Sequence, residues 1–561
     1  MVAVLPFAGI LTVVYARAGP TSRVHRDVGT TQGVVRGYLT PDPPHYAFLG
    51  LPYSRPPTRY DRFKAPKSPP RWDGIFEATH RVKCPQPDGE GVENCLVLNI
   101  FTRAPKSPPR WDGIFEATHR VKQSMQRHCQ GLRLEDPGES LEICGTYRSR
   151  PSSDSRLDNE WGNFQAPVRL LREGLLIVTF NYRLGALGFL CLGITEAPGN
   201  AGLKDIVAAL YWIHKNIANF GGNPLDITVY GFGFGAAAVE LVLLSGLSNG
   251  LLHKVILESG TALSPVSVSY DSLTIAADVA TMLGYKGRKD AKDLSMFFRT
   301  ASAVELLKIN LIFLPCIEST NNNAFIDTDL MDIFKKRNYH KVPMMLIFTD
   351  EVKLTNVSRN YFESIPENFE LLLPNNLEFK SDELKHKIGE LVKDFYFSGT
   401  EIGDSIFRVY EEYFRDIIME YPVIKSAALH AQASSNPVYL MKFTYKCNSR
   451  QLDDVETRDY KLIDYLFNGN DASDVTHELA LRRLVTMWSS FIKIGDPTPL
   501  ITSLIPVVWP PVTASDSIKG VTGLIFGDVL AISDVTTERV IFWDDIYRRF
   551  LRKHKINDTM P

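Results

Sequence analysis

The sequence predicts an α/β fold, in which one large domain holds a largely parallel central sheet flanked by helices. Two observations lead to this prediction. Short strands that are apolar throughout alternate with long helical stretches, which is typical of a parallel sheet buried on both faces. One of these strands runs into a helix through a turn of alternating glycines, residues 231–235 (GFGFG). We assign residues 19–552 to this single domain.

The second half of the chain shows the alternation most clearly. Strands are expected where β-branched and other apolar residues run together, and helices where apolar residues recur at helical spacing. The expected elements are a strand at 175–182, a helix at 203–220, a strand at 226–230, a helix at 236–244, and strands at 254–257, 343–348 and 437–445.

The turn at 231–235 has the glycine spacing of a nucleophile elbow, Gly-x-Ser-x-Gly. In such an elbow a strained turn between a strand and a helix holds a serine hydroxyl out of the sheet. Here the central residue is Gly233, which has no side chain to attack a carbonyl. The alternative, a dinucleotide-binding loop, requires Gly-x-Gly-x-x-Gly, and the sixth position is Ala236. The sequence therefore indicates an elbow without its nucleophile.

Composition restricts the class of protein. The chain has 561 residues, of which 44% are hydrophobic and 22% charged, as in ordinary globular domains. Its formal net charge of -2 gives no electrostatic argument for nucleic-acid binding. No spacing of cysteine and histidine suggests a metal site, and we expect no cofactor.

The N-terminus predicts secretion. Residues 2–14 are apolar but too few to span a bilayer, and Ala16-Arg-Ala18 resembles a signal-peptidase site, so residues 1–18 are assigned to a signal peptide. No later stretch is apolar enough to serve as a transmembrane anchor, and the tail at 553–561 is polar. The acceptor sequons at Asn356 and Asn557 predict glycosylation on a secretory route.

The seven cysteines are too few to form a disulfide scaffold in a chain of this length. Cys84 and Cys95 enclose a short loop and could pair in an oxidising compartment. Cys191, Cys316 and Cys447 lie apart from one another in apolar surroundings, and we interpret them as buried free thiols.

A perfect internal duplication interrupts the pattern. Residues 65–83 recur without a change at 104–122, which suggests a recent exon duplication or a faulty gene model. The following stretch, 123–163, is polar and lacks periodicity, so it is predicted to be disordered or out of frame. Residues 104–163 are therefore treated as anomalous, and the sheet is expected to be interrupted between Arg103 and Asn163.

Stretches along almost the whole chain, apart from 104–163, carry a family resemblance. They include 48–54 (FLGLPYS), 93–100 (ENCLVLNI), 181–189 (NYRLGALGF), 199–205 (GNAGLKD), 216–224 (NIANFGGNP) and 538–544 (ERVIFWD). In this order they resemble the type B carboxylesterase/cholinesterase family of α/β-hydrolases. The resemblance implies the α/β-hydrolase fold and a disulfide between Cys84 and Cys95.

The resemblance also implies where a triad of serine, histidine and glutamate would lie. The nucleophile position falls on Gly233, the acid on Glu351 and the base on Asp459. Two of the three residues are thus replaced, and no catalytic residue is expected. The histidines nearest to the base position, His430 and His477, lie outside the register and are interpreted as surface or core residues.

The surroundings of the triad also depart from the family. A His-Gly-Gly loop, which supplies oxyanion donors in the family, occurs nowhere in the chain. The remaining donor would be the backbone NH of Phe234. We expect the rings of Phe232 and Phe234 to fill the space that a substrate carbonyl would need. Glu351 is interpreted as a hydrogen-bonded carboxylate at the end of a strand, in preference to a vestigial triad acid.

Two functions remain open from the sequence. The first is a secreted, non-catalytic protein similar to neuroligins, neurotactin and glutactin, with an unknown protein partner or a small hydrophobic ligand. The second is a carboxylic ester hydrolase whose catalytic motifs are corrupted in this sequence. The first explains the losses at Gly233 and Asp459 together, whereas the second requires a separate error at each position.

Overall fold

The structure is a computed structural model, and only part of the chain is described here. The described residues are 24–41, 43–86, 89–103, 141–145 (backbone only), 168–307, 309, 313–319, 324–350, 368–398, 404–445, 462, 466, 475–515 and 518–553. The predicted signal peptide and the predictions for Glu351, Asn356, Cys447, Asp459 and Asn557 fall outside these residues.

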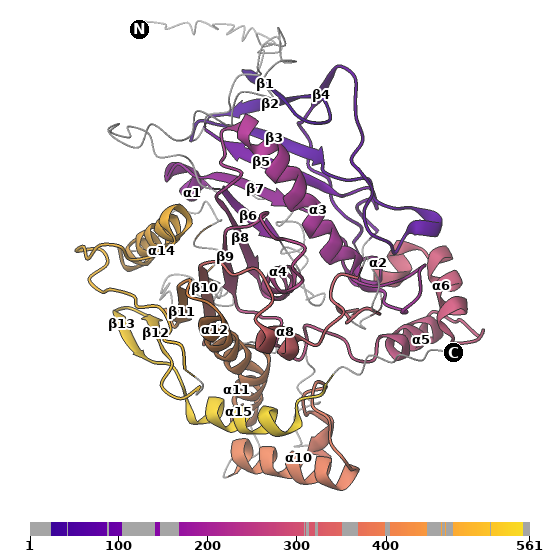
Figure 1. Ribbon diagram of the computed structural model, residues 1–561, viewed down its shortest axis with the longest axis vertical. Coiled ribbons are helices and arrows are strands. Elements are labelled where there is room, and N and C mark those ends of the chain that lie inside the picture. Colours follow the sequence, from indigo (N-terminus) through magenta and orange to yellow (C-terminus); the bar gives the residue numbers. More distant parts are fainter. Residues whose placement is uncertain are drawn as a thin grey trace, which may run out of the picture.

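One sheet of 13 strands runs through the described part of the chain (Figure 1). Its order is β1-β2-β3-β5-β7-β6-β8-β9-β10-β11-β12-β13, with β4 paired to β2. All neighbours from β7 to β12 in this order are parallel, and those nearer the two edges are mostly antiparallel. The largely parallel sheet that the sequence predicts is confirmed. The strands are β1 (His25–Gly29), β2 (Val34–Thr40), β3 (His45–Pro52), β4 (Ile75–Glu77), β5 (Val97–Thr102), β6 (Leu141–Gly145), β7 (Leu176–Phe180), β8 (Ile227–Phe232), β9 (Lys254–Glu258), β10 (Met344–Thr349), β11 (Val438–Phe443), β12 (Thr522–Phe526) and β13 (Leu530–Asp534).

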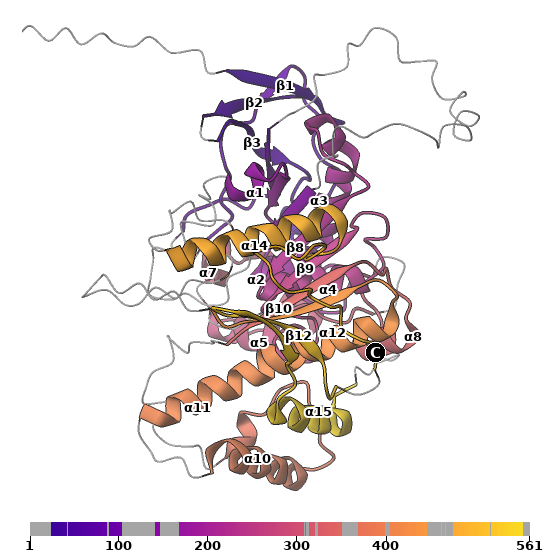
Figure 2. The same ribbon diagram turned by 90° about the vertical axis from the view of Figure 1, so that its left-hand side faces the viewer.

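Helices cover both faces of the sheet, with α1 and α14 on one side and α3, α4 and α12 on the other (Figure 1). At one end of the molecule α10, α11 and α15 gather beyond the last strands (Figure 2). None of the helices in the described ranges is long and apolar enough to cross a membrane. The helices are α1 (Val168–Arg172), α2 (Gly185–Phe189), α3 (Ala201–Asn216), α4 (Phe234–Leu244), α5 (Ser272–Met282), α6 (Ala291–Thr300), α7 (Ala303–Leu307), α8 (Leu330–Lys336), α10 (Asp382–Phe397), α11 (Asp404–Arg415), α12 (Tyr421–Ala433), α14 (Val475–Ile494) and α15 (Glu538–Phe550), with short turns η1 (Arg59–Asp61), η2 (Ile217–Phe220), η3 (Phe369–Leu371) and the π-helix η4 (Asp416–Glu420).

Two hydrophobic cores lie on opposite faces of the sheet. Successive side chains of a strand point to opposite faces, so β10 contributes Leu346 and Phe348 to one core and Met345 and Ile347 to the other. All four side chains are completely buried. Burial on both faces explains why these strands are apolar throughout and do not alternate with polar residues.

The sheet is continuous at β6, where the sequence predicts an interruption. Residues Leu141–Gly145 form a strand between β7 and β8, with Ile143 opposite Val178 and Val229. Buried backbone NH and C=O groups need hydrogen-bond partners, and a strand at this place supplies them to both neighbours. The expected interruption is therefore wrong for these five residues. Residues 104–140 and 146–163 lie outside the described residues, so their nature stays a prediction.

Cys191 and Cys316 form a disulfide, although the sequence suggests two buried free thiols. They are 125 residues apart, and only the fold brings them together. A side chain at Gly199 would place its Cβ 2.6 Å from the Cys316 sulfur, so the loop after α2 needs a glycine there. The Asn200 amide holds the other side, since it donates to the Cys316 carbonyl at 2.8 Å and accepts from its NH at 3.0 Å. The free-thiol interpretation is wrong for this pair.

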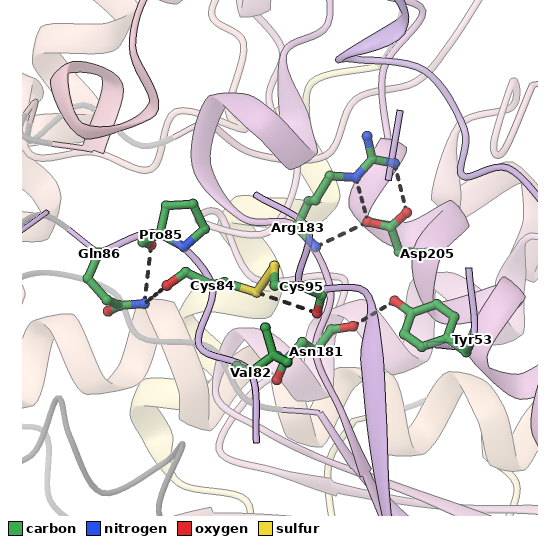
Figure 3. Close-up of a disulfide and its surroundings, with 9 residues drawn as sticks. All are labelled: Tyr53, Val82, Cys84, Pro85, Gln86, Cys95, Asn181, Arg183 and Asp205. Carbon is green, nitrogen blue, oxygen red and sulfur yellow. Dashed lines mark hydrogen bonds and ion pairs between the residues drawn. A yellow bond between two sulfur atoms is a disulfide. The ribbon is translucent and has the colours of Figure 1, made fainter. Parts of the chain in front are cut away.

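The expected disulfide between Cys84 and Cys95 is present and lies beside two of the stretches that carry the family resemblance (Figure 3). Behind it, Asp205 on α3 accepts two hydrogen bonds of 2.7 Å from the Arg183 guanidinium. Both side chains are buried, so their charges must be paired. The ion pair fixes α3 to the end of β7.

A second buried carboxylate, Glu240, connects the helix after the glycine turn to two other elements. One oxygen accepts from Ser426 at 2.5 Å and from His430 at 2.9 Å, both on α12. The other accepts from the Thr261 hydroxyl at 2.6 Å and from the Ala262 NH at 2.7 Å, after β9. Burial opposes ionisation, but the hydrogen bonds from His430, Ser426 and Thr261 outweigh it and lower the pKa of Glu240. His430 is thus a core histidine, as the sequence suggests.

The Cys191–Cys316 disulfide should stabilise the fold more than the Cys84–Cys95 disulfide. A link across 125 residues restricts the unfolded chain more than one across 11, by loop-entropy values of about 5 and about 3 kcal/mol. We expect C191A/C316A to lower the thermal unfolding midpoint more than the matched variant C84A/C95A. Scanning calorimetry measures both, and the opposite order would contradict the prediction.

Replacing Glu240 with glutamine should destabilise the protein in a pH-dependent way. The variant E240Q loses hydrogen bonds to a buried charge, and we expect a loss of about 3 kcal/mol at neutral pH. Because the folded pKa of Glu240 lies below its usual value of 4.5, the wild type's advantage is complete above that pH. It disappears as the pH falls through the folded pKa. Thermal midpoints between pH 7 and pH 4 test this, with E390Q on the surface of α10 as the control. Equal midpoints for wild type and E240Q at pH 7 would refute it.

Candidate functional site at the strand-to-helix turn

Gly233 lies between β8 and α4 in a strained conformation, with φ 58° and ψ -124°. A side chain makes this region of φ and ψ unfavourable, by about 1–3 kcal/mol, so glycine is the residue that adopts it most easily. The Gly233 NH donates to the Glu258 carbonyl at 2.8 Å, and its own carbonyl accepts from the NH of Ala236 and of Ala237. The turn therefore has the shape of a nucleophile elbow at the end of a central parallel strand.

Two neighbouring glycines make this turn possible. A Cβ on Gly260 would lie 1.9 Å from the Gly233 carbonyl oxygen, and one on Gly231 would lie 2.4 Å from the Gly235 carbonyl oxygen. In both cases the obstructing atom belongs to the backbone, which cannot move aside without distorting the turn. The packing of an elbow is thus intact around a residue that has no nucleophile.

The rings of Phe232 and Phe234, which the sequence predicts to fill the space beside Gly233, pack on opposite faces of the sheet, and their filling of that space stays a prediction. Phe234 packs in the core on the α4 side, with its ring 5.5 Å from that of Phe189 and perpendicular to it. Phe232 packs against the other core, and Gly233 between them stays partly exposed. Apart from these two neighbours, no heavy atom of the described residues lies within 4 Å of the place of a Gly233 Cβ. Away from Phe232 and Phe234, the described residues therefore leave room for a Cβ at this position.

A buried carboxylate lies directly under the turn. Glu258 stands opposite Phe232 in the pairing of β8 with β9. Its carboxylate accepts a hydrogen bond of 2.6 Å from the Tyr230 hydroxyl, and both residues are completely buried. Sequence reasoning missed this pair because the register that joins the two strands is not visible in the sequence.

Ser259 supplies a hydroxyl close to the turn but lacks the environment of a nucleophile. It precedes Gly260, has φ 55°, and its buried Oγ makes no hydrogen bond within the described residues. A serine hydroxyl is a weak nucleophile until a base takes its proton. His430 binds Glu240 and, at 2.9 Å, the Tyr339 hydroxyl. His477 lies buried on α14. Neither histidine shows a hydrogen bond to Ser259 in the described part.

The position of the triad acid follows the end of β10, where Asp350 is fixed. The Arg415 guanidinium donates to the Asp350 carbonyl at 3.0 Å, and the Lys442 ammonium lies 3.3 Å from its carboxylate. The next residue, Glu351, is the expected acid and lies outside the described residues. Asp350 and the elbow thus both lie at the carboxyl edge of the sheet. Glu351 and Asp459 lie outside the described residues, so their roles stay predictions.

A charged cluster on the π-helix η4 packs against β10. Burial raises the pKa of Asp416 and of Glu420, although nearby Arg and Lys side chains oppose the shift. Asp416 accepts from Tyr396 at 2.7 Å and lies 3.0 Å from the Arg539 guanidinium. These partners come from two other helices, α10 and α15, so no sequence pattern indicates the cluster. Within the described residues, no group of three or more His, Cys, Asp and Glu side chains is arranged to hold a metal ion.

The chain is similar to two esterases or hydrolases and to a neuroligin. The chain is 27% identical to pyrethroid hydrolase Ces2a of Mus musculus over 482 residues, covering 81% of this chain and 80% of the relative. It is also 27% identical to juvenile hormone esterase of Heliothis virescens over 518 residues, covering 84% and 85%. Neuroligin-2 of Mus musculus is 27% identical over 504 residues, covering 81% of this chain and 58% of the relative.

The fold and a family model point to the same group of proteins. The crystal structure of juvenile hormone esterase from Manduca sexta matches with a TM-score of 0.74 at 23% identity, covering 94% of this chain and 100% of that chain, which shows a shared fold. The model of the carboxylesterase family matches residues 24–119 and 159–520. The α/β-hydrolase sheet, its elbow-shaped turn and this match show that the chain belongs to the carboxylesterase family.

Proposed function

We propose that the chain is a secreted, non-catalytic member of the carboxylesterase family that acts by binding. It would bind a protein partner through its surface, in an adhesion-type role, or a small hydrophobic ligand near the former nucleophile position. The observation that carries the proposal is Gly233, which occupies an intact elbow and offers no nucleophile.

The size of the expected loss supports this proposal. In a serine hydrolase, removal of the nucleophile or the base alone reduces turnover by about a million-fold. Here Gly233 stands at the nucleophile position, and the resemblance assigns Asp459 to the base position. The absence of a His-Gly-Gly sequence would remove oxyanion donors as well. What remains is a folded scaffold, and the similarity to neuroligin-2 supports a role in protein interaction.

The second candidate is a carboxylic ester hydrolase whose motifs are corrupted in this sequence. Relatives named as a pyrethroid hydrolase and a juvenile hormone esterase favour it. So does the room beside Gly233, where a Cβ would have no heavy atom of the described residues within 4 Å apart from those of its two chain neighbours. Sequencing the transcript from the codon for Ala65 to that for Leu175, and across those for Gly233 and Asp459, separates the candidates. Serine and histidine codons at the latter two positions would establish the hydrolase.

We expect the wild-type protein to release no nitrophenol from short nitrophenyl esters above the buffer rate, and to resist labelling by a fluorophosphonate. With no nucleophile at position 233, neither reagent has a group to react with. The variant G233S alone should remain inactive against esters, because the resemblance assigns the base position to Asp459, which would not take the proton of the new serine as a histidine does. Mass spectrometry after fluorophosphonate treatment measures the labelling.

The matched variant S259A tests whether Ser259 is the residue that reacts. If the wild type is labelled and S259A is not, Ser259 is the nucleophile and the non-catalytic proposal is wrong. A family esterase with an intact triad is the positive control for both reagents.

A further inference from the structure

The C-terminal end of α15 and the segment after it form a basic cluster, which we call the tail cluster: Arg548, Arg549, Arg552 and Lys553. Arg548 and Arg549 share one carboxylate, Asp545, and Arg552 pairs with Asp271 at 2.9 Å. Glu378, whose NH donates to the Phe550 carbonyl, adds a third carboxylate near Arg552, so four cations face three carboxylates. Cations at the end of a helix also stabilise its dipole, but that effect ends within the last turn and does not explain Lys553.

Two apolar residues that lie between the basic residues in sequence, Phe550 and Leu551, anchor the tail cluster. The Phe550 ring lies 5.1 Å from that of Phe379, and Leu551 pairs with Leu377 in an isolated bridge. The basic side chains before and after these two anchors are exposed or half-exposed. The structure therefore presents the charges on an ordered surface.

A second basic cluster lies at the far end of α5. The loop between α5 and α6 and the start of α6 carry what we call the loop cluster: Lys286, Arg288, Lys289 and Lys292. All four are exposed, and only Arg288 has an ion pair among the described residues, with Asp290 and Asp293. In the loop cluster four cations face two carboxylates.

The two clusters are joined through α5. Both terminal nitrogens of Arg552 bind Asp271, which precedes the first residue of α5, and the guanidinium lies over the Tyr270 ring at 5.1 Å. The 11 residues of α5 extend for about 17 Å at 1.5 Å per residue. The clusters therefore lie at opposite ends of one short helix.

The positive charge here contrasts with the remainder of the protein. With these carboxylates counted, the tail cluster has an excess of one positive charge and the loop cluster an excess of two, whereas the formal net charge of the whole chain is -2. The rest of the chain must then carry an excess of five negative charges. Such an uneven distribution attracts an anionic partner to this end of the molecule.

We infer that the tail and loop clusters together form a binding surface for a sulfated polysaccharide. A linear polyanion can contact two basic clusters separated by the length of a helix. An anionic membrane is less suitable for the tail cluster, because Phe550 and Leu551, its apolar residues within the described part of the chain, are held against Phe379 and Leu377. This inference does not depend on whether the protein is catalytic.

The test uses heparin as the probe and the full-length protein at about 0.15 M salt, where long-range attraction is largely screened. The variant R549Q/K553Q/K289Q/K292Q should bind heparin at least about tenfold more weakly, with a shallower dependence of affinity on salt, because fewer counterions are released on binding. The control R71Q/K215Q/K387Q/R408Q removes four exposed positive charges elsewhere and should bind like the wild type.

Three results would overturn the inference. The wild type could fail to bind heparin at this salt concentration. The control could lose as much affinity as the site variant, which would show that only net charge matters. Vesicles containing phosphatidylserine could bind through the four site residues while heparin does not, which would assign the surface to a membrane. The separate pairs R549Q/K553Q and K289Q/K292Q, each checked by thermal midpoint, repeat the test if the fourfold variant does not fold.

Discussion

The strained turn at Gly233 is the constraint on which the surrounding structure depends. A Cβ on Gly260 would clash with the Gly233 carbonyl, and the Gly233 NH donates a hydrogen bond to the carbonyl of Glu258. β8, β9 and α4 therefore approach one another more closely than side chains would allow. The catalytic serine of the family needs this geometry, but the packing of two strands and a helix needs it too. A glycine at the centre of the turn therefore leaves the fold in place.

Buried charge fixes the layers around this turn. Glu240 joins α4 to α12 and to the segment after β9, and the Arg183–Asp205 pair joins α3 to β7. A buried carboxylate with several donors is stable only while all of its partners remain in position. These networks hold the carboxyl edge of the sheet in one arrangement, which suits a binding surface as well as a catalytic site.

The family relationship and the site residues lead to different expectations of function. Membership of the carboxylesterase family rests on the whole chain, whereas hydrolysis rests on three residues and an oxyanion loop. A fold supports many functions, and activity has to be argued from the site. Gly233 is described, and apart from its chain neighbours no described residue lies within 4 Å of a Cβ placed there; Glu351 and Asp459 lie outside the described residues. The proposal of a binding role therefore rests on the nucleophile position, and the transcript test examines the remaining positions.

The sequence by itself determined the largely parallel sheet, the positions of its central strands along the chain and the elbow with glycine at its centre. Apolar runs and glycine spacing are local signals, and local signals report local structure. Only the tertiary structure decided that Cys191 pairs with Cys316, that Leu141–Gly145 completes the sheet, and that Phe232 and Phe234 pack into separate cores. Each of these features depends on contacts between residues that are distant in the sequence, or on hydrogen-bonding groups of neighbouring strands that need a partner. The pattern of a single segment does not contain this information.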